Sequence, residues 1–387
     1  MYDALIIGAG PAGSTAARLL ARAGWSVGLV EKSSFPRRKV CGEFISATSL
    51  PLLYDRGVRD GFLGQAGPEV RCVGLFARDV AMTSAMPSAS RSVAGWGRAL
   101  GRDRLDLMLA EAAAKAGAEI WQPWKMIALD RQSDRFACTL SQGDRQQQIR
   151  ALIVIAANGS WEKNPWLSMR PHSHRPSDLL AFKAHFSGSA LPQDLMPLLV
   201  FPGGYGGMVH TDGGRVSLSC CIRRDALEAC RKNYPGLAAG EAVIQHIVNT
   251  SDGVREALRP AQLDGAWLSA GPIRPGIRPR YRDGIFFVGN SAGEAHPIIA
   301  EGISMAMQSA WLLSQRLIEG RGNLAEAGRL YAKDWHKAFA TRIRAAAAFA
   351  HLAMWPSAAR ALPIVKRFPE ILTWGARLSG KTTQLVP

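Results

Sequence analysis

The stretch YDALIIGAGPAGSTAARLLARAGWSVGLVEKS, residues 2–33, contains the pattern that decides the fold. A short apolar run ends at Gly8, an alanine-rich segment over 14–23 has a helical composition, and a second apolar run over 25–30 ends at Glu31. This order predicts a strand, a helix and a second strand, which is the unit with which α/β proteins bind dinucleotides.

The three glycines between the first strand and the helix form G-x-G-x-x-G, and each has a physical task. Gly8 allows the tight turn, Gly10 lets a pyrophosphate approach the backbone, and Gly13 lets the helix pack closely on the strand. Pro11 and Ala12 lie between the last two glycines and are expected to contact the cofactor as well.

The ends of the helix and of the second strand add two further signals. The helix N-terminus offers unpaired amides and a partial positive charge to phosphate groups. Glu31, which is followed by Lys32, can accept hydrogen bonds from the ribose hydroxyls of an adenosine. Because a carboxylate would repel a 2′-phosphate, the sequence predicts FAD or NAD at this site and argues against NADP.

Composition limits the remaining possibilities. The chain has 387 residues and a net charge of +16, long enough for two or three domains. It has no apolar run of about 20 residues and no basic segment before the first apolar run, so we expect a cytoplasmic protein without a signal peptide. The six cysteines lack metal-ligand spacing, and no metal site is predicted. The basic charge indicates either an inert surface or attraction to an anionic membrane or an acidic carrier protein; no nucleic-acid motif accompanies it.

Four further segments follow the glycine loop in order: RRKVCGEFIS (37–46), GRDRLDLMLAEAAAKAGAEI (101–120), IRALIVIAANGS (149–160) and VGNSAGEAHPIIAEGIS (288–304). Together they resemble the single-Rossmann FAD-dependent oxidoreductases, which include aromatic hydroxylases, geranylgeranyl reductases and flavin halogenases. The CGE and AEGI segments are most similar to the geranylgeranyl reductase branch. The resemblance implies an α/β fold: a Rossmann-like FAD-binding domain of the glutathione-reductase type, an antiparallel-sheet substrate domain and a helical C-terminal tail.

The resemblance also implies contacts to FAD outside the glycine loop. In the family, the Cys-Gly pair lies beside the isoalloxazine ring, and an arginine at the position of Arg102 lies near the pyrophosphate. Asn158 and Asn290 stand where the family has aspartate, so they can form hydrogen bonds but carry no charge. The asparagine at position 158 weakens the case that the protein uses NAD(P)H directly. The expected contacts are Arg38, Cys41, Gly42, Arg102, Asn158, Gly159, Gly289, Asn290, Ala292, Pro297, Gly302 and Ile303.

Three residues are candidates for catalysis. Cys41 and His296 could supply protons, and Pro297 is expected at the flavin ring. For each of the first two an ordinary structural role stays open, as a small thiol at a helix start and as a hydrogen-bonded histidine.

The second half of the chain predicts the substrate domain. Over residues 166–284, apolar and polar residues alternate in the way typical of an antiparallel sheet. The pattern over residues 323–387 predicts helices. The FAD-binding domain would then comprise 1–165 and 285–322, with part of 45–100 near the substrate. The basic C-terminal helices fit either a cap over the flavin domain or a segment lying on an anionic membrane. The resemblance and the sheet pattern together indicate five substrate-side residues, of which the last three could equally be core: Glu43, Ser46, Phe201, Tyr205 and Met208.

These observations predict an FAD-dependent oxidoreductase that acts on a small apolar biosynthetic substrate, free or carrier-bound. A monooxygenase that hydroxylates a polyketide, phenolic or isoprenoid substrate ranks slightly ahead of an ene-reductase that saturates isoprenoid double bonds. A halogenase ranks lower, because no lysine lies between Lys39 and Lys115 and the W-x-W-x-I-P motif is missing. A non-catalytic flavoprotein also ranks lower. Since no second G-x-G-x-x-G follows a strand, the electrons are expected from transiently bound NAD(P)H, a partner reductase or a ferredoxin.

Overall fold

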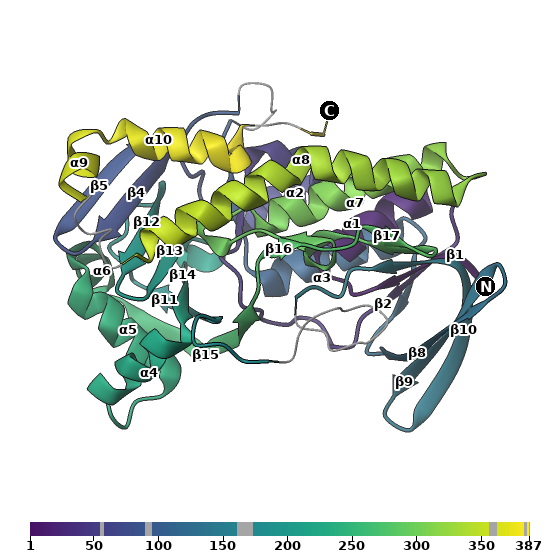
Figure 1. The fold of residues 1–387 in the computed structure, drawn as a ribbon, viewed down its shortest axis with the longest axis horizontal. Coiled ribbons are helices and arrows are strands. Elements are labelled where there is room, and N and C mark those ends of the chain that lie inside the picture. The colour runs from purple at the N-terminus through teal and green to yellow at the C-terminus, as the bar shows by residue number, and fades with distance from the viewer. Residues whose placement is uncertain (55–57, 90–94, 161–172, 356–361, 383–384, 387) are drawn as a thin grey trace.

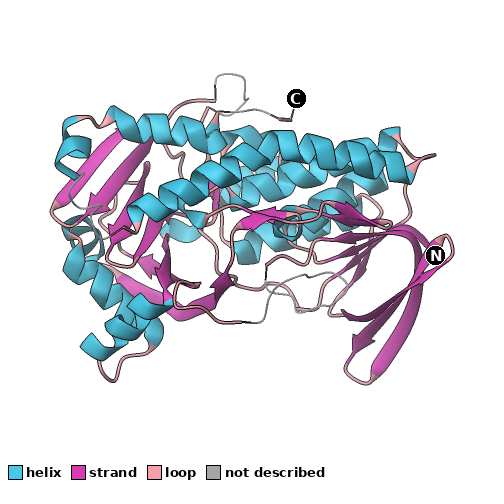
Figure 2. Cartoon of the chain, in the orientation of Figure 1, coloured by secondary structure: helices cyan, strands magenta, loops and turns pink. Residues whose placement is uncertain are grey.

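The fold consists of two sheets side by side, crossed by long helices (Figures 1 and 2). The computed structural model describes residues 1–54, 58–89, 95–160, 173–355, 362–382 and 385–386. The mainly parallel sheet lies at the right in Figure 1 and the mainly antiparallel sheet at the left, with α7 (Gly302–Glu319) and α8 (Leu324–Ala353) above them. No helix among the described residues is long and apolar enough to cross a membrane.

The first sheet carries the dinucleotide loop. Its central strands are parallel, and they are apolar along their length because helices cover them. β8 (Lys125–Gln132) and β9 (Arg135–Gln142) extend β10 as an antiparallel meander. The predicted α/β class is thereby confirmed. In order across the sheet, the strands are β17 (Tyr281–Arg282), β18 (Ile285–Phe287), β10 (Arg145–Ala156), β1 (Tyr2–Ile7), β2 (Val27–Val30) and β7 (Glu119–Trp121).

Helix α1 (Pro11–Arg22) leaves β1 directly and packs between α3 (Arg102–Lys115) and α7. Gly8 has a φ of +107°, which is the left-handed turn that the spacing predicts. A Cβ on Gly13 would lie 1.8 Å from the carbonyl oxygen of Gly8. The close contact between helix and strand therefore requires glycine at position 13.

The second sheet draws on more of the chain than the sequence pattern indicated. β4 and β5 come from the segment before residue 90, and β4 runs parallel to β12, whereas the other pairings are antiparallel. The expected domain boundary at 165–166 lies outside the described residues. In order the strands are β15 (Gln262–Ile273), β11 (Leu179–Ser187), β14 (Val216–Arg223), β13 (Gly204–His210), β12 (Leu195–Phe201), β4 (Cys72–Ala77) and β5 (Val80–Ala85).

Three short helices cover one face of this sheet: α4 (Arg224–Asn233), α5 (Ala239–Thr250) and α6 (Asp252–Leu258). Phe201 and Met208 pack into the core on that side, and Phe201 makes an edge-to-face contact with His246 of α5. Because side chains alternate along a strand, Tyr205 points to the opposite face. The two residues expected in a substrate wall with Tyr205 therefore fit the core interpretation.

Helix α8 joins the two halves. Its buried stripe begins in the core of the first sheet with Tyr331, Trp335 and Phe339. About two and three turns after Phe339, Ala346 and Ala350 pack in the cluster that contains Tyr205. The helix begins at Asn323, whose side chain accepts the backbone N–H of Glu326 at 3.1 Å.

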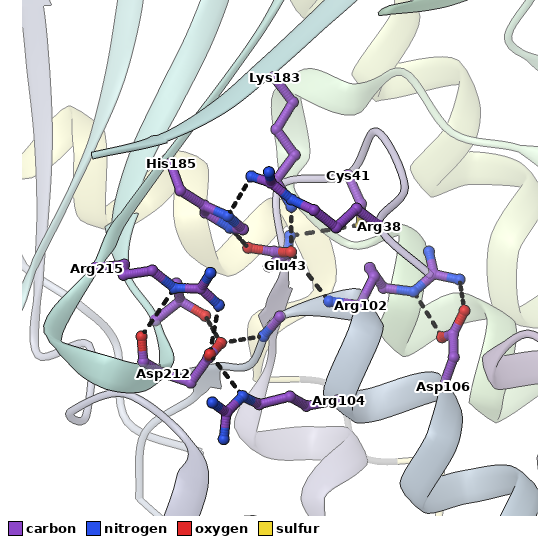
Figure 3. Close-up of polar contacts among 12 residues, drawn as sticks. Arg38, Cys41, Glu43, Arg102, Arg104, Asp106, Lys183, His185, Asp212 and Arg215 are labelled. Carbon is purple, nitrogen blue, oxygen red and sulfur yellow. Dashed lines mark hydrogen bonds and ion pairs between the residues drawn. The ribbon is translucent and has the colours of Figure 1, made fainter. Parts of the chain in front are cut away.

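A buried ion cluster also joins the two sheets (Figure 3). Glu43 precedes β3 (Phe44–Ile45), is 1% exposed and has a φ of +64°, an unfavourable conformation for a residue with a side chain. Its carboxylate pairs with the ammonium of Lys183 and accepts Nε2–H of His185 at 2.8 Å, both from β11. It also accepts the backbone N–H of Arg102, at the start of α3, at 3.0 Å.

The first testable consequence concerns Gly13. Gly13→Ala should lower the free energy of unfolding by about 1 to 3 kcal/mol, because its Cβ would force α1 away from β1, and it should weaken FAD retention. Gly64→Ala is the matched control: Gly64 lies in α2 (Arg59–Gln65), and no atom lies within 4 Å of its Cβ position. That change should stabilise the protein by about 0.5 to 1 kcal/mol. Urea denaturation measures both; equal effects would contradict the proposed contact.

The second concerns acid stability. Burial alone would raise the pKa of Glu43, but the hydrogen bond from His185 and the charge of Lys183 outweigh it and lower the pKa from 4.5 to about 2. In this range the unfolded chain binds a proton that the folded protein does not bind. The stability that the cluster contributes should thus be complete above pH ~4.5 and be lost as the pH falls toward about 2.

A thermal-denaturation series over this range can be compared with the Glu43→Gln, Lys183→Met double variant. The variant should show a shallower loss of stability as the pH falls from about 4.5 to about 2. If wild type and variant lose stability equally steeply as the pH falls, the cluster does not contribute to the pH dependence of stability.

Candidate active site

A large cavity lies between the second sheet, the loop that follows β18 and the C-terminal helices. Its volume is about 1810 Å³. Most residues that were expected near the flavin ring or the substrate line it, although they come from three distant parts of the chain: Cys41, Gly42, Glu43, Tyr205, Asn290, His296, Pro297, Gly302 and Ile303.

The dinucleotide loop borders the start of α1. The helix begins after Gly10 with no side-chain cap and no acidic residue in its first turn, so its terminal amides are available to a phosphate. The guanidinium of Arg102 lies 3.6 Å from the Cβ position of Gly10. Asp106 holds that guanidinium in a bidentate pair at 2.7 and 2.8 Å. A fixed cation beside free amides fits the pyrophosphate of FAD.

Glu31 lies at the same loop, as its place at the end of β2 predicts. Its Oε2 accepts the backbone N–H of Ala9 at 3.1 Å and its Oε1 that of Ser33 at 3.0 Å. Arg37 pairs with it at 3.2 Å. The carboxylate is therefore held beside the glycine loop, where an adenosine ribose would bind; Lys32 is exposed next to it.

Two predicted side chains point elsewhere. Arg38 donates to Nδ1 of His185 at 2.8 Å and to the carbonyl of Asp264 at 3.4 Å, so it faces the second sheet instead of the dinucleotide loop. Ser46 is fully buried and donates to Glu301 at 3.2 Å, so it supports the flavin segment from behind and does not line the cavity.

Sequence reasoning missed Lys39. Its ammonium lies 3.7 Å from the Cβ position of Gly159. Burial, together with the charges of Arg102 and Arg37, lowers its pKa to about 8. A cation so placed would be stabilised by phosphate. The signal was present in the sequence, because Lys39 belongs to the same K-x-C-G motif as Cys41.

The segment 288–294 is tied to the end of β10. Ser291 Oγ donates to Asn158 Oδ1 at 3.1 Å and accepts Gly159 N–H at 3.2 Å. The Asn290 amide donates to Glu294 Oε1 at 3.2 Å. An aspartate at position 290 would place two carboxylates against each other, which explains why the amide stands there.

The floor of the cavity contains a polar pair. The hydroxyl of Tyr205 lies 2.5 Å from Nδ1 of His296. Burial, and to a smaller extent the charge of His351, lowers the pKa of His296 to about 4, while burial raises the pKa of Tyr205 well above 10. Both groups are therefore neutral near pH 7. Pro297 is exposed to the cavity beside them, and Cys41 is half-buried in the same wall.

The C-terminal segment completes the site, which no motif indicated. Lys381 is 6% exposed; its ammonium donates to the carbonyl of Ile299 at 2.6 Å and pairs with Glu301 at 3.1 Å. Glu301 directly precedes α7, so the tail is fastened to the start of the helix that is expected to face the flavin.

Comparisons with known proteins agree with this geometry. A family model described as "FAD binding domain" matches residues 1–165. The chain is 25% identical to conditioned medium factor receptor 1 of Dictyostelium discoideum, over 82% of this chain and 64% of that protein; it thus spans less than two thirds of that relative. It is 25% identical to digeranylgeranylglycerophospholipid reductase of Methanosarcina mazei, over 86% of this chain and 80% of the relative. It is also 25% identical to a 1H-pyrrole-2-carbonyl-(peptidyl-carrier protein) chlorinase of Pseudomonas fluorescens, over 83% of this chain and 77% of the relative.

Solved structures share the fold at lower identity. The flavin-dependent brominase Bmp2 has a TM-score of 0.79 and 20% identity, covering 99% of this chain and 94% of that one. A geranylgeranyl bacteriochlorophyll reductase-like protein of Thermoplasma acidophilum has a TM-score of 0.70 and 20% identity, over 100% and 92%. The glycine loop and the family match show that residues 1–165 belong to the FAD-binding domain family, and over most of its length the chain is similar to a digeranylgeranylglycerophospholipid reductase and to a carrier-protein chlorinase.

Proposed function

We propose that this enzyme reduces a carbon–carbon double bond in a long apolar substrate. The observation that carries the proposal is the cavity: its volume of about 1810 Å³ would hold the flavin ring, whose expected neighbours line it, and a long substrate beside the ring. Its walls are mainly apolar, and the neutral Tyr205–His296 pair lies at its floor. Reductases named for an isoprenoid lipid among the relatives support the same substrate class.

The chain's own residues would provide the proton of this reaction. In its reduced form, bound FAD would supply the hydride, and with it both electrons, that one carbon of the double bond needs. The other carbon needs a proton, and the Tyr205 hydroxyl lines the cavity in protonated form because burial raises its pKa. His296, neutral and 2.5 Å away, can hold the phenolate by hydrogen bonding until a proton is returned from solvent.

Hydroxylation of an apolar substrate is the second candidate. The neutral His296 favours it, because an imidazole at the cavity wall can accept the proton of a substrate hydroxyl group. The electron donor in either case is proposed to be transiently bound NAD(P)H, a partner reductase or a ferredoxin.

The test separates the two reactions by their need for oxygen. Reduced holoenzyme mixed anaerobically with polyprenyl lipids should return to oxidised flavin as the double bond is saturated, which absorbance and mass spectrometry measure. Tyr205→Phe should slow this step about 10²- to 10⁴-fold. Tyr234→Phe, which alters a tyrosine at the end of α4, should not change it. Reoxidation that requires oxygen and adds an oxygen atom to the product would instead establish hydroxylation.

The mouth of the cavity is proposed to dock on an anionic membrane. We define the C-terminal apolar surface as eight large side chains that are 46–68% exposed: Phe349, Leu352, Trp355, Ile364, Phe368, Ile371, Trp374 and Leu378. All except Ile364 line the cavity. The surface is thus continuous with the space in which an apolar substrate would bind.

The orientation of helix α10 (Glu370–Ala376) on the second sheet explains why these apolar side chains are exposed. Thr373 faces the second sheet, where its hydroxyl bonds the carbonyl of Ala85 at 2.7 Å. Ile371, Trp374 and Leu378, spaced three and four apart, consequently share the outward face. Exposed cations accompany them at Arg344, Lys366, Arg367 and Arg377, against one acid, Glu370. Aromatic side chains with surrounding cations favour an anionic lipid surface.

Vesicle binding tests this docking independently of turnover. The holoenzyme should cosediment with phosphatidylcholine vesicles that contain phosphatidylglycerol, and weakly with phosphatidylcholine alone. Lys366→Glu with Arg367→Glu should lower the partition coefficient about 30-fold or more. The matched control, Arg231→Glu with Lys232→Glu at the end of α4, makes the same change in net charge on another helix. Equal losses in both variants, or binding of an acidic carrier protein but not of vesicles, would overturn membrane docking.

A further inference from the structure

Arg342 is a buried cation to which no carboxylate among the described residues is hydrogen-bonded; burial lowers the pKa of its guanidinium, and the charge of Glu301 offsets this only in part. It lies on α8, is 7% exposed and lines the cavity. Its Nη1 is buried and has no hydrogen-bond partner among the described residues. Its one ring contact is with Phe339 on its own helix, at 5.7 Å from guanidinium carbon to ring centroid.

Arg102 shows how a buried arginine is paired with a carboxylate elsewhere in the same protein. It is also 7% exposed, but Asp106 satisfies its guanidinium with two hydrogen bonds. Burying a charge is costly unless the charge is paired and hydrogen-bonded. Arg342 lacks such a pair, so the protein retains a cation that is unfavourable in the absence of a ligand.

The C-terminal segment shapes the surroundings of Arg342. Gly380 has a φ of +95°, and a Cβ there would lie 2.1 Å from the guanidinium carbon of Arg342. Only glycine can therefore pass this closely over the group. Nearby, Lys381 is already paired with Glu301 at 3.1 Å. Two cations and one carboxylate leave the cluster with a net charge of +1 next to the cavity.

From this arrangement we propose that Arg342 binds an anionic group of the substrate, a carboxylate or a phosphate, with Lys381 contributing to the positive potential. This inference rests on the proposed substrate cavity and adds a polar end to an otherwise apolar ligand. Ala346, one helical turn from Arg342, packs in the cluster that contains Tyr205. An anion held by Arg342 would therefore fix how far along the chain the reacting carbon atoms lie from the head group.

Unreactive ligands with one common tail test the proposal. Oxidised holoenzyme is titrated with dodecyl phosphate, dodecanoate and dodecanol, and binding is followed by calorimetry and by the flavin spectrum. The wild-type protein should bind one or both anions more tightly than the alcohol, and the stronger of the two identifies the head group. Arg342→Gln should weaken anion binding about 10- to 100-fold and leave dodecanol binding unchanged.

The control is Arg329→Gln, on the same helix but outside the C-terminal apolar surface and its cations, where the side chain is exposed. It should not alter the binding of any of the three ligands. Without ligand, Arg342→Gln should raise the Tm, because it removes an uncompensated buried charge. This readout separates a binding role from a structural one, for which the Tm would fall.

Two results would overturn the proposal. If Arg342→Gln weakens the binding of dodecanol as much as the binding of the anions, the residue merely shapes the cavity. If it lowers FAD retention or shifts the flavin potential without changing the preference for anions, its partner is the flavin. Because binding is measured on oxidised enzyme without turnover, failure of the proposed reduction would leave these outcomes unchanged.

Discussion

The structure depends on one buried carboxylate, that of Glu43. It accepts a backbone N–H from the start of α3 and pairs with Lys183 and His185 on the second sheet. Removing either partner would leave a charge buried in a medium of low polarity, so the two sheets are held at one separation. The cluster lies at the edge of the cavity, which Cys41, Gly42 and Glu43 line.

The C-terminal helices are part of the site and not an appendage. Helix α8 begins in the core of the first sheet and ends against the face of the second sheet that carries Tyr205. The tail then returns, and Lys381 reaches the carboxylate of Glu301 and the carbonyl of Ile299. Truncating such a tail would remove a wall of the cavity and a buried ion pair together. The cap and the membrane-facing segment that the sequence left as alternatives are thus compatible, because one face of α10 packs inward while the other is exposed.

Charge is distributed unevenly between the two ends of the expected cofactor site. Near the glycine loop, Arg102 and Lys39 provide cations suited to a pyrophosphate. At the floor of the cavity, Tyr205 and His296 are both neutral near pH 7. Asn290 follows the same logic, because its amide donates to Glu294 where a carboxylate would repel it. The departure from the family's aspartate at position 290 is therefore explained by its neighbour Glu294 and need not signal loss of activity.

The sequence by itself determined the dinucleotide loop and the α/β class, because these follow from local spacing: a strand, three glycines, a helix and an acid can be read in one stretch. The choice of FAD over NAD came from the resemblance of the four further segments to a family. Of the residues that the sequence predicted near the flavin and the substrate, most line the cavity, because most belong to contiguous motifs. Only the tertiary structure decided that Phe201 and Met208, which also line the cavity, pack in the core of the second sheet while Tyr205 packs on its other face, that Ser46 is buried, and that β4 and β5 join the second sheet. Arg342 and Lys381 have no motif around them. Their role depends on a helix and a tail that meet the flavin segment from a distant part of the chain, and long-range pairing of charges leaves no periodic or local signal in a sequence.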